Sequence, residues 1–166
     1  MHLKGVAEVR FEEFAAAHVE SLLRLARLLT GNPHEAEDLV QESLLRAHDR
    51  WELVGGARNP AAYMRRLLVN VHRGQRRGRT LDTVAVEAPD RAPLTTMTWE
   101  EREALRQALG TLPLRQRTAV VLRFYEDLDV AEIAEWMGLR ESSVRSALAR
   151  ALEALRAAEQ RDRSQR

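Results

Sequence analysis

The sequence predicts an all-α protein made of two small helical domains joined by a flexible linker. Apolar residues recur at the spacing of an amphipathic helix through most of the chain. Helix-start signals, such as Asn-Pro at 32–33 and at 59–60, divide these periodic segments. The periodicity is lost between residues 74 and 98, a stretch longer than loops inside one compact domain usually are. We therefore expect domains at 1–73 and 99–166 with a linker at 74–98.

Three helices are expected in the first domain. The first spans Phe11–Thr30 and ends at Gly31. The second begins after Asn32, with Pro33 at its first position, and continues to about Val54. The third begins after Asn59 by the same capping logic and extends towards Gly74 or beyond. In the linker that follows, Val84 and Val86 suggest a short strand.

The second domain is predicted to end in a helix-turn-helix over residues 129–156. Asp129 and Glu132 have the spacing of a capping box, and Gly138 can adopt the left-handed conformation that ends a helix. Two further helices, from Trp99 and from Pro113, precede it, and the charged tail after Leu155 is expected to fray.

One face of the last helix favours DNA, although a solvated helical hairpin would give a similar pattern. The opposite face is apolar, whereas this one carries hydroxyl and guanidinium groups, and the chain has no carboxylate from Ser142 to Arg150. Such groups suit phosphates and base edges in a major groove.

Basic residues are concentrated in one part of the chain. The net charge of the 166 residues is only +1. The stretch from Leu53 to Leu81 nevertheless contains no acidic residue and carries seven arginines, while the remainder is acidic on balance. A basic stretch of this kind is typical of a polyanion-binding surface. A solvated basic face is the simpler alternative, and a membrane-surface helix is disfavoured because the stretch lacks an apolar counter-face rich in Trp, Phe and Leu.

Several other classes of protein are disfavoured by composition. The chain has no cysteine, no apolar run near the ~20 residues of a membrane span, and charges where a signal peptide would be apolar. We therefore expect a cytoplasmic protein that is not bound to a membrane. The histidines are scattered and no glycine-rich phosphate loop follows a strand. The sequence thus predicts no catalytic residue, no metal and no cofactor.

Several motifs in their order resemble those of a known family. These are EAEDLVQESLLRA, then NPAAYMRRLLVNVHRGQRR, a linker, and LRQALGTLPLRQRTAVVLRFYEDLDVAEIAEWMGL followed by the last helix. This pattern over residues 11–156 is similar to that of an extracytoplasmic function (ECF) sigma factor of the sigma-70 family, more narrowly to the SigE-like subfamily of actinobacteria.

The resemblance implies a dissociable subunit of bacterial RNA polymerase that directs promoter-specific initiation. Region 2, at 1–73, would bind the clamp of the largest polymerase subunit and open the minus-ten element. Region 4, at 99–166, would bind the polymerase flap and read the minus-thirty-five element. An anti-sigma factor is a further partner expected from the family. Polymerase contacts, carried over by motif, would be Asp38, Gln41, Glu42, Leu45 and Arg46.

The resemblance also places the two DNA contacts. The minus-ten element would contact Arg58, Asn59, Tyr63, Arg66, Asn70 and Arg73, and the minus-thirty-five element Ser142, Ser143, Arg145, Ser146 and Arg150. For Tyr63, a place in the core is about as well supported as stacking on a base. Arg140 stands where the family has a capping Ser or Thr, and Ala147 and Ala149 where it commonly has Arg or Thr.

The linker is long enough to join the two predicted DNA contacts. Residues 74–98 extend to roughly 80 Å, whereas a spacer of about 17 base pairs measures about 58 Å. Asp82, Glu87 and Asp90 would mimic nucleic acid near the RNA exit channel, a hypothesis that unchanged abortive initiation after their removal would contradict.

Two other kinds of protein remain as alternatives. One is a stand-alone regulator that binds a palindrome as a dimer, which does not explain a separate basic region beside a polar helix. The other is a helical adaptor or anti-sigma-like protein that binds no DNA, which the seven arginines disfavour.

Overall fold

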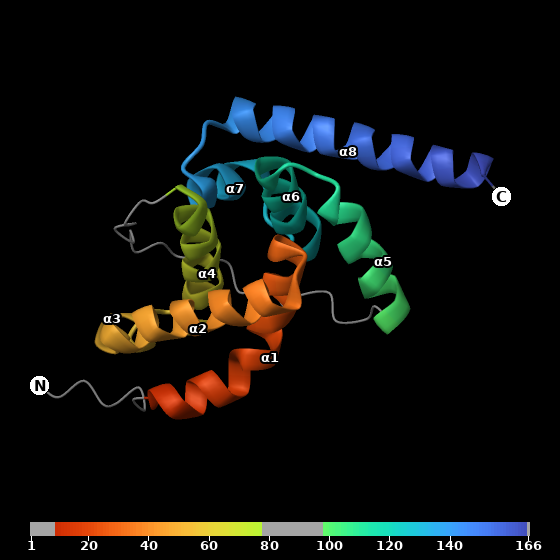
Figure 1. Ribbon diagram of the computed structural model, residues 1–166. Coiled ribbons are helices and arrows are strands. Elements are labelled where there is room, and N and C mark those ends of the chain that lie inside the picture. The colour runs from red at the N-terminus through yellow and green to blue at the C-terminus, as the bar shows by residue number, and fades with distance from the viewer. Residues whose placement is uncertain (1–8, 78–97, 166) are drawn as a thin grey trace, which may run out of the picture. The chain divides into compact units, whose positions relative to one another are not determined.

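The prediction of an all-α fold is confirmed. The computed structural model describes residues 9–77 and 98–165, and within these ranges it contains helices and turns but no strand (Figure 1). The helices are α1 Phe11–Thr30, α2 Pro33–Asp49, α3 Trp51–Gly55, α4 Pro60–Arg77, α5 Trp99–Gly110, α6 Leu114–Val120, the π-helix η1 Val121–Tyr125, α7 Val130–Met137 and α8 Glu141–Ser164.

The described residues form two compact units. The first contains residues 9–26 and 37–77, and the second contains residues 27–36 and 98–165. The last turn of α1 and the start of α2 therefore belong to the same unit as α5–α8. The domains predicted at 1–73 and 99–166 would group these two segments with the rest of residues 1–73 instead. Because α4 continues to Arg77, it extends beyond the predicted start of the linker. The rest of the linker, with the suggested strand at Val84 and Val86 and the three acidic residues, lies outside the described residues.

In the first unit, the segment predicted as one helix up to Val54 is two helices. α2 ends at Asp49, and Arg50 has φ −124° and ψ 30°, outside the helical region. The turn brings the Trp51 ring against Phe11 and Phe14, with ring centroids 5.4 and 5.1 Å away. Its indole Nε1 donates a hydrogen bond of 3.0 Å to the Val9 carbonyl. These contacts with α1 favour the break, and no local sequence pattern reveals them.

Two asparagines cap helices as predicted. The Asn32 side chain accepts hydrogen bonds from the backbone amides of His34 (2.9 Å) and Glu35 (3.2 Å) at the start of α2. The Asn59 side chain accepts one from the amide of Ala62 (3.0 Å) at the start of α4. Each asparagine satisfies amides that the first helical turn leaves without a partner.

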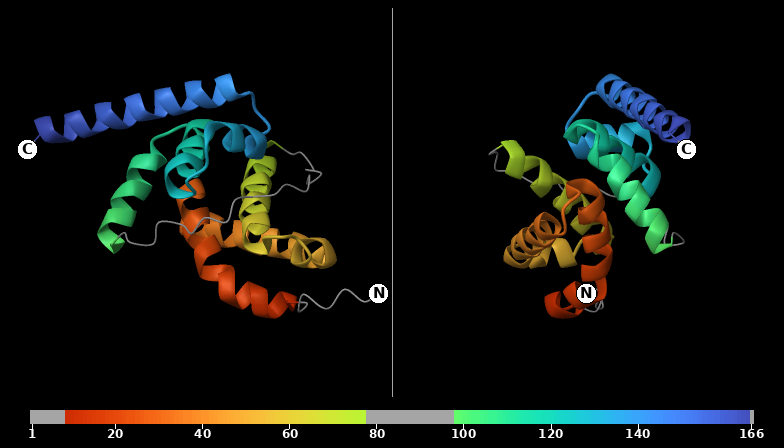
Figure 2. Two further views of the ribbon diagram at one scale, coloured as in Figure 1. Left: turned by 180° about the vertical axis from the view of Figure 1, so that it is seen from behind. Right: turned by 45° about the vertical axis from the view of Figure 1, so that its right-hand side comes forward.

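The second unit is organised around α8, which packs against α5, α6 and α7. Its buried stripe includes Val144, Ala147, Leu148 and Ala151. Seen from behind, the end of α8 extends beyond α5 (Figure 2, left). The helix continues to Ser164, so the prediction of a frayed tail after Leu155 was wrong. An ion pair between Glu159 and Arg163, one helical turn apart, supports this extension.

α6 continues directly into η1, a transition that the sequence did not predict. The amide of Glu126 bonds to the carbonyl of Val121 at 3.1 Å, five residues earlier. Asp127 then has φ 55°, a left-handed conformation that is unfavourable for a residue with a Cβ atom. The Arg123 guanidinium donates to the Leu128 carbonyl at 3.0 Å and so ties η1 to the turn before α7.

Candidate nucleic-acid and polymerase interfaces

The helix-turn-helix predicted at 129–156 is present in the second unit. Asp129 accepts a hydrogen bond from the Glu132 amide at 2.8 Å, and Glu132 accepts one from the Asp129 amide at 2.7 Å, which completes the predicted capping box. Gly138 ends α7 with φ 60° and ψ 38°. The turn that this left-handed residue makes directs the chain into α8.

The first turns of α8 present the polar face that the sequence predicted. Ser142, Arg145, Ser146 and Arg150 are exposed and Ser143 is partly exposed. Arg145 is ion-paired at 2.9 Å with Glu141, which lies one turn earlier and just outside the acid-free stretch. The Arg145 side chain is 63% accessible and the Glu141 side chain is 50% accessible. A stronger anion such as a phosphate therefore breaks the pair easily.

The three departures from the expected family pattern have different structural settings. The Arg140 side chain makes no capping hydrogen bond to the first turn of α8, and Ser142 does not replace it as the N-cap residue. Ala147 is only 3% exposed and lies in the buried stripe of α8, while Ala149 is exposed. A larger residue would thus be hard to place at position 147 in this chain without repacking.

The predicted docking face of α2 is polar with an apolar centre. Asp38 and Gln41 are exposed, while Glu42 and Arg46 are partly exposed and form an ion pair of 2.8 Å. Leu45 is 63% exposed in the centre of this polar face. An apolar group surrounded by polar ones is the usual composition of a protein-binding surface.

The six residues predicted to contact the minus-ten element are not equally accessible. Arg58 is exposed, and Asn70 and Arg73 are partly exposed. Tyr63 and Arg66 are only 6% and 7% exposed. For Tyr63 this burial favours the core position over a base-stacking position.

Asn59, just before α4, is both the cap of that helix and a predicted contact of the minus-ten element. Its side chain is partly exposed and already accepts the capping bond from Ala62. Its amide NH2 group can still donate to a base.

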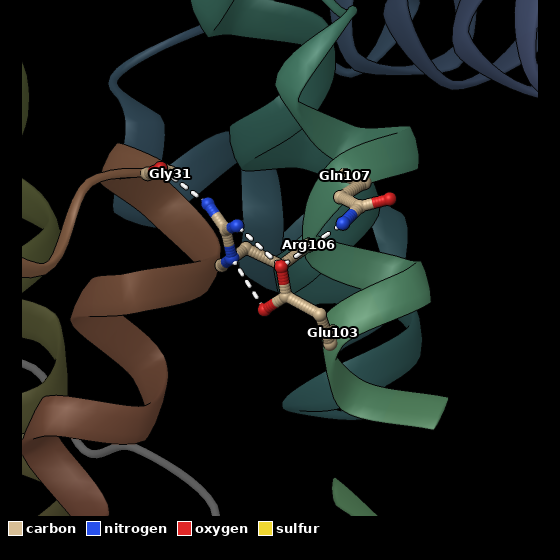
Figure 3. Close-up of polar contacts among 4 residues, drawn as sticks. All are labelled: Gly31, Glu103, Arg106 and Gln107. Carbon is tan, nitrogen blue, oxygen red and sulfur yellow. Dashed lines mark hydrogen bonds and ion pairs between the residues drawn. The ribbon is translucent and has the colours of Figure 1, made fainter. Parts of the chain in front are cut away.

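A cluster in the second unit was missed by the sequence interpretation. Glu103 accepts a hydrogen bond from Arg106 Nε at 2.9 Å and a second one from Arg106 Nη2, and it also accepts one from Gln107 at 3.0 Å. Arg106 Nη1 donates to the Gly31 carbonyl at 2.6 Å (Figure 3). The spacing of Glu103 and Arg106 was the only available signal, because Gly31 is 75 residues away from Arg106.

This cluster fixes the charge of Glu103. The hydrogen bond from Arg106, followed by that from Gln107, lowers the pKa of Glu103 from 4.5 to about 2. The same hydrogen bond raises the pKa of Arg106. Both groups are therefore charged at neutral pH.

Two kinds of feature are absent from the described part of the chain: clusters of metal-ligating side chains and helices that could span a membrane. Within residues 9–77 and 98–165, no three His, Asp or Glu side chains are grouped so that they could hold a metal ion. The helices described there are also too short or too polar to cross a bilayer.

Comparison with known proteins defines the class. Residues 14–80 match the family "Sigma-70 region 2", and residues 102–155 match "Sigma-70, region 4". The RNA polymerase sigma-E factor of Streptomyces coelicolor is 36% identical over 150 residues, which cover 89% of this chain and 85% of that protein. The ECF RNA polymerase sigma factor SigM of Mycobacterium tuberculosis is 32% identical over 145 residues, or 85% and 72% of the two chains.

A solved structure supports the fold. The sigma factor RpoE of Bartonella quintana, crystallised with the anti-sigma factor NepR, has a TM-score of 0.62 at 22% identity and matches 89% of this chain and 94% of its own. The chain thus belongs to the sigma-70 family of RNA polymerase sigma factors, in its ECF group, a family that does not consist of catalytic enzymes. Its function is that of a sigma factor in promoter-specific initiation of transcription.

Proposed function

We propose that this chain contacts polymerase and promoter through separate faces. Core polymerase binds α2 at Asp38, Gln41, Glu42, Leu45 and Arg46, and the flap binds the C-terminal domain. The exposed Leu45 in the centre of a polar face is the observation that supports this division most strongly, because burial of an apolar side chain in an interface is favourable.

DNA is contacted by the other two faces in this proposal. The basic stretch opens the minus-ten element through Arg58, Asn59, Asn70 and Arg73, with Tyr63 and Arg66 supporting it from the core. Ser142, Ser143, Arg145, Ser146 and Arg150 read the minus-thirty-five element. Exposure of hydroxyls and guanidinium groups on the first turns of α8 supports this assignment.

The proposal also covers the location, the chemistry and the regulation of the protein. The protein acts in the cytoplasm, needs no cofactor and catalyses no reaction itself, because phosphodiester chemistry belongs to the polymerase. An anti-sigma factor is the regulatory partner that we propose, by analogy with the Bartonella quintana protein, which was crystallised with one.

A transcription assay with purified core polymerase tests the proposal. Core plus this chain should give promoter-specific transcripts from genomic fragments, while core alone should not. Leu45→Asp should abolish these transcripts by placing a charge in the interface. Leu53→Asp, which changes the 49% exposed leucine of α3 outside the predicted set, should leave them intact. If no fragment gives a specific transcript while the free protein binds DNA tightly, the chain acts as a stand-alone regulator instead.

A further inference from the structure

The end of α1 covers an apolar groove in the second unit. The groove has a volume of about 170 Å³, and Leu28 forms part of its lining. The other lining residues come from α5, α6 and η1 and are Leu105, Leu109, Val120, Val121, Phe124 and Tyr125. Leu28 is 6% exposed, whereas Phe124 is 52% exposed. Leu28 therefore covers one part of the groove and leaves the part beside Phe124 open.

Two arginines hold this end of α1 by its backbone. Arg106 Nη1 donates to the Gly31 carbonyl at 2.6 Å, and Arg117 Nη1 donates to the Leu29 carbonyl at 3.2 Å. Carbonyls at the end of a helix lack intrahelical partners and carry the negative end of its dipole, so a guanidinium is a favourable partner. Glu103 binds two nitrogens of Arg106 and thereby orients the third towards Gly31 (Figure 3).

We propose that residues 27–31 are a removable cover of this groove, and that they compete with core polymerase for the second unit. The part of this proposal that concerns polymerase rests on the proposed function. A cover of this kind differs from a permanent part of the core in how it is held. Arg106 and Arg117 hold it through the Gly31 and Leu29 backbone carbonyls, and Arg106 remains 28% accessible. A partner helix that fills the whole groove, including the open part at Phe124, would bury more apolar surface than Leu28 does.

The charge of Glu103, which orients Arg106, does not change near neutral pH. Glu103 stays ionised far below neutral pH because Arg106 and Gln107 hydrogen-bond to it.

Thiol labelling tests whether the cover opens independently of the core. The chain has no cysteine, so single substitutions give clean probes. Leu28→Cys reports on the cover, Ala104→Cys on an exposed position of α5, and Ala151→Cys on the buried stripe of α8. We expect the thiol at position 28 to react at least about tenfold more slowly than that at 104. Arg106→Ala should accelerate thiol labelling at position 28 by about three- to tenfold, because it removes a partly accessible charged hydrogen bond. The labelling rate at position 151 should not change.

Arg102→Ala is the matched control, because Arg102 is an exposed arginine of the same helix and should not affect position 28. Equal labelling at positions 28 and 104 would mean that no cover exists. Equal acceleration at positions 28 and 151 would mean that residues 27–31 are a permanent part of the core. Hydrogen exchange of residues 27–36 in cysteine-free chains provides a second measurement, should Leu28→Cys disturb the fold.

Binding to core polymerase tests the consequence. Arg106→Ala should raise the association rate with core about as much as it accelerates labelling, whereas Arg102→Ala should not. Accelerated labelling with an unchanged association rate would overturn the competition. If neither the variant nor the unaltered chain bound core, the proposed function itself would fail, while the labelling result would still decide whether the cover exists.

Discussion

Glu103 is a residue whose charge depends on two neighbours in the folded chain. Hydrogen bonds from Arg106 and Gln107 lower its pKa from 4.5 to about 2. Because folding lowers this pKa, the bonds stabilise the fold fully above pH 4.5, and this contribution is lost as the pH falls towards 2.

A carboxyl titration followed by NMR checks this prediction. The Glu103 side chain should titrate near pH 2, and Arg106→Ala should return its midpoint towards 4.5. Arg102→Ala should leave it unchanged. A midpoint near 4.5 in the unaltered chain would show that the cluster does not form in solution.

Asp127 is a second residue whose environment has a measurable consequence. It has a Cβ atom but adopts φ 55°, a region that glycine occupies without steric strain. Asp127→Gly and Asp127→Ala both remove the carboxylate, so their difference reports the backbone alone. We expect the glycine variant to be more stable by about 1 kcal/mol, measured from urea unfolding midpoints. Equal midpoints would indicate that the turn relaxes to a negative φ.

At the scale of elements, the capping box is the feature on which α7 depends. Asp129→Ala removes the acceptor for the Glu132 amide and should lower the free energy of unfolding by about 1 kcal/mol. Asp129→Asn keeps an equivalent acceptor and should remain within a few tenths of the unaltered chain. Urea denaturation of the three proteins gives the comparison. An alanine variant as stable as the asparagine variant would show that the cap contributes nothing.

Elements whose causes are local were predictable from sequence. The caps at Asn32, Asn59 and Asp129 and the turn at Gly138 depend on a few neighbouring residues, and the structure contains all four. The break at Arg50 depends instead on contacts of Trp51 with Val9 and α1. The transition to η1 likewise has no local capping signal.

The same distinction holds for the candidate sites. Exposure of α8 side chains such as Ser142 and Arg145 follows from helical periodicity, so the sequence placed them correctly on the surface. Burial of Tyr63 and Arg66 depends on what packs over α4, which the sequence does not show. The contact between Arg106 and Gly31 joins residues that are distant in the chain, so no motif announces it.

At the scale of the whole molecule, promoter recognition and polymerase binding should be separable. Arg145→Ala should reduce discrimination between promoter and mutated minus-thirty-five elements by about 1–3 kcal/mol if the arginine contacts a guanine. Affinity for core should not change. Arg156→Ala, which removes an exposed arginine further along α8, is the matched control. Competition between promoters in transcription assays measures the discrimination, and a lost complex with core would contradict the assignment.

The reverse pattern is expected for α2. Asp38→Ala together with Glu42→Ala should weaken binding to core by at least about tenfold without altering which promoter the assembled enzyme prefers. Glu37→Ala together with Asp49→Ala removes the same charge from the same helix, outside the predicted contacts, and should have little effect. Fluorescence titration with labelled core compares the two pairs. Equal affinities would remove Asp38 and Glu42 from the interface.

The ion pair between Glu141 and Arg145 has a consequence for how the protein is distributed among its binding partners. A genome offers about a million or more non-specific sites that compete for any basic surface. Glu141 lies 2.9 Å from Arg145 and places a negative charge beside the surface that would approach a phosphate in the proposed complex. We expect this carboxylate to weaken non-specific DNA binding only slightly, because the exposed ion pair is easily broken.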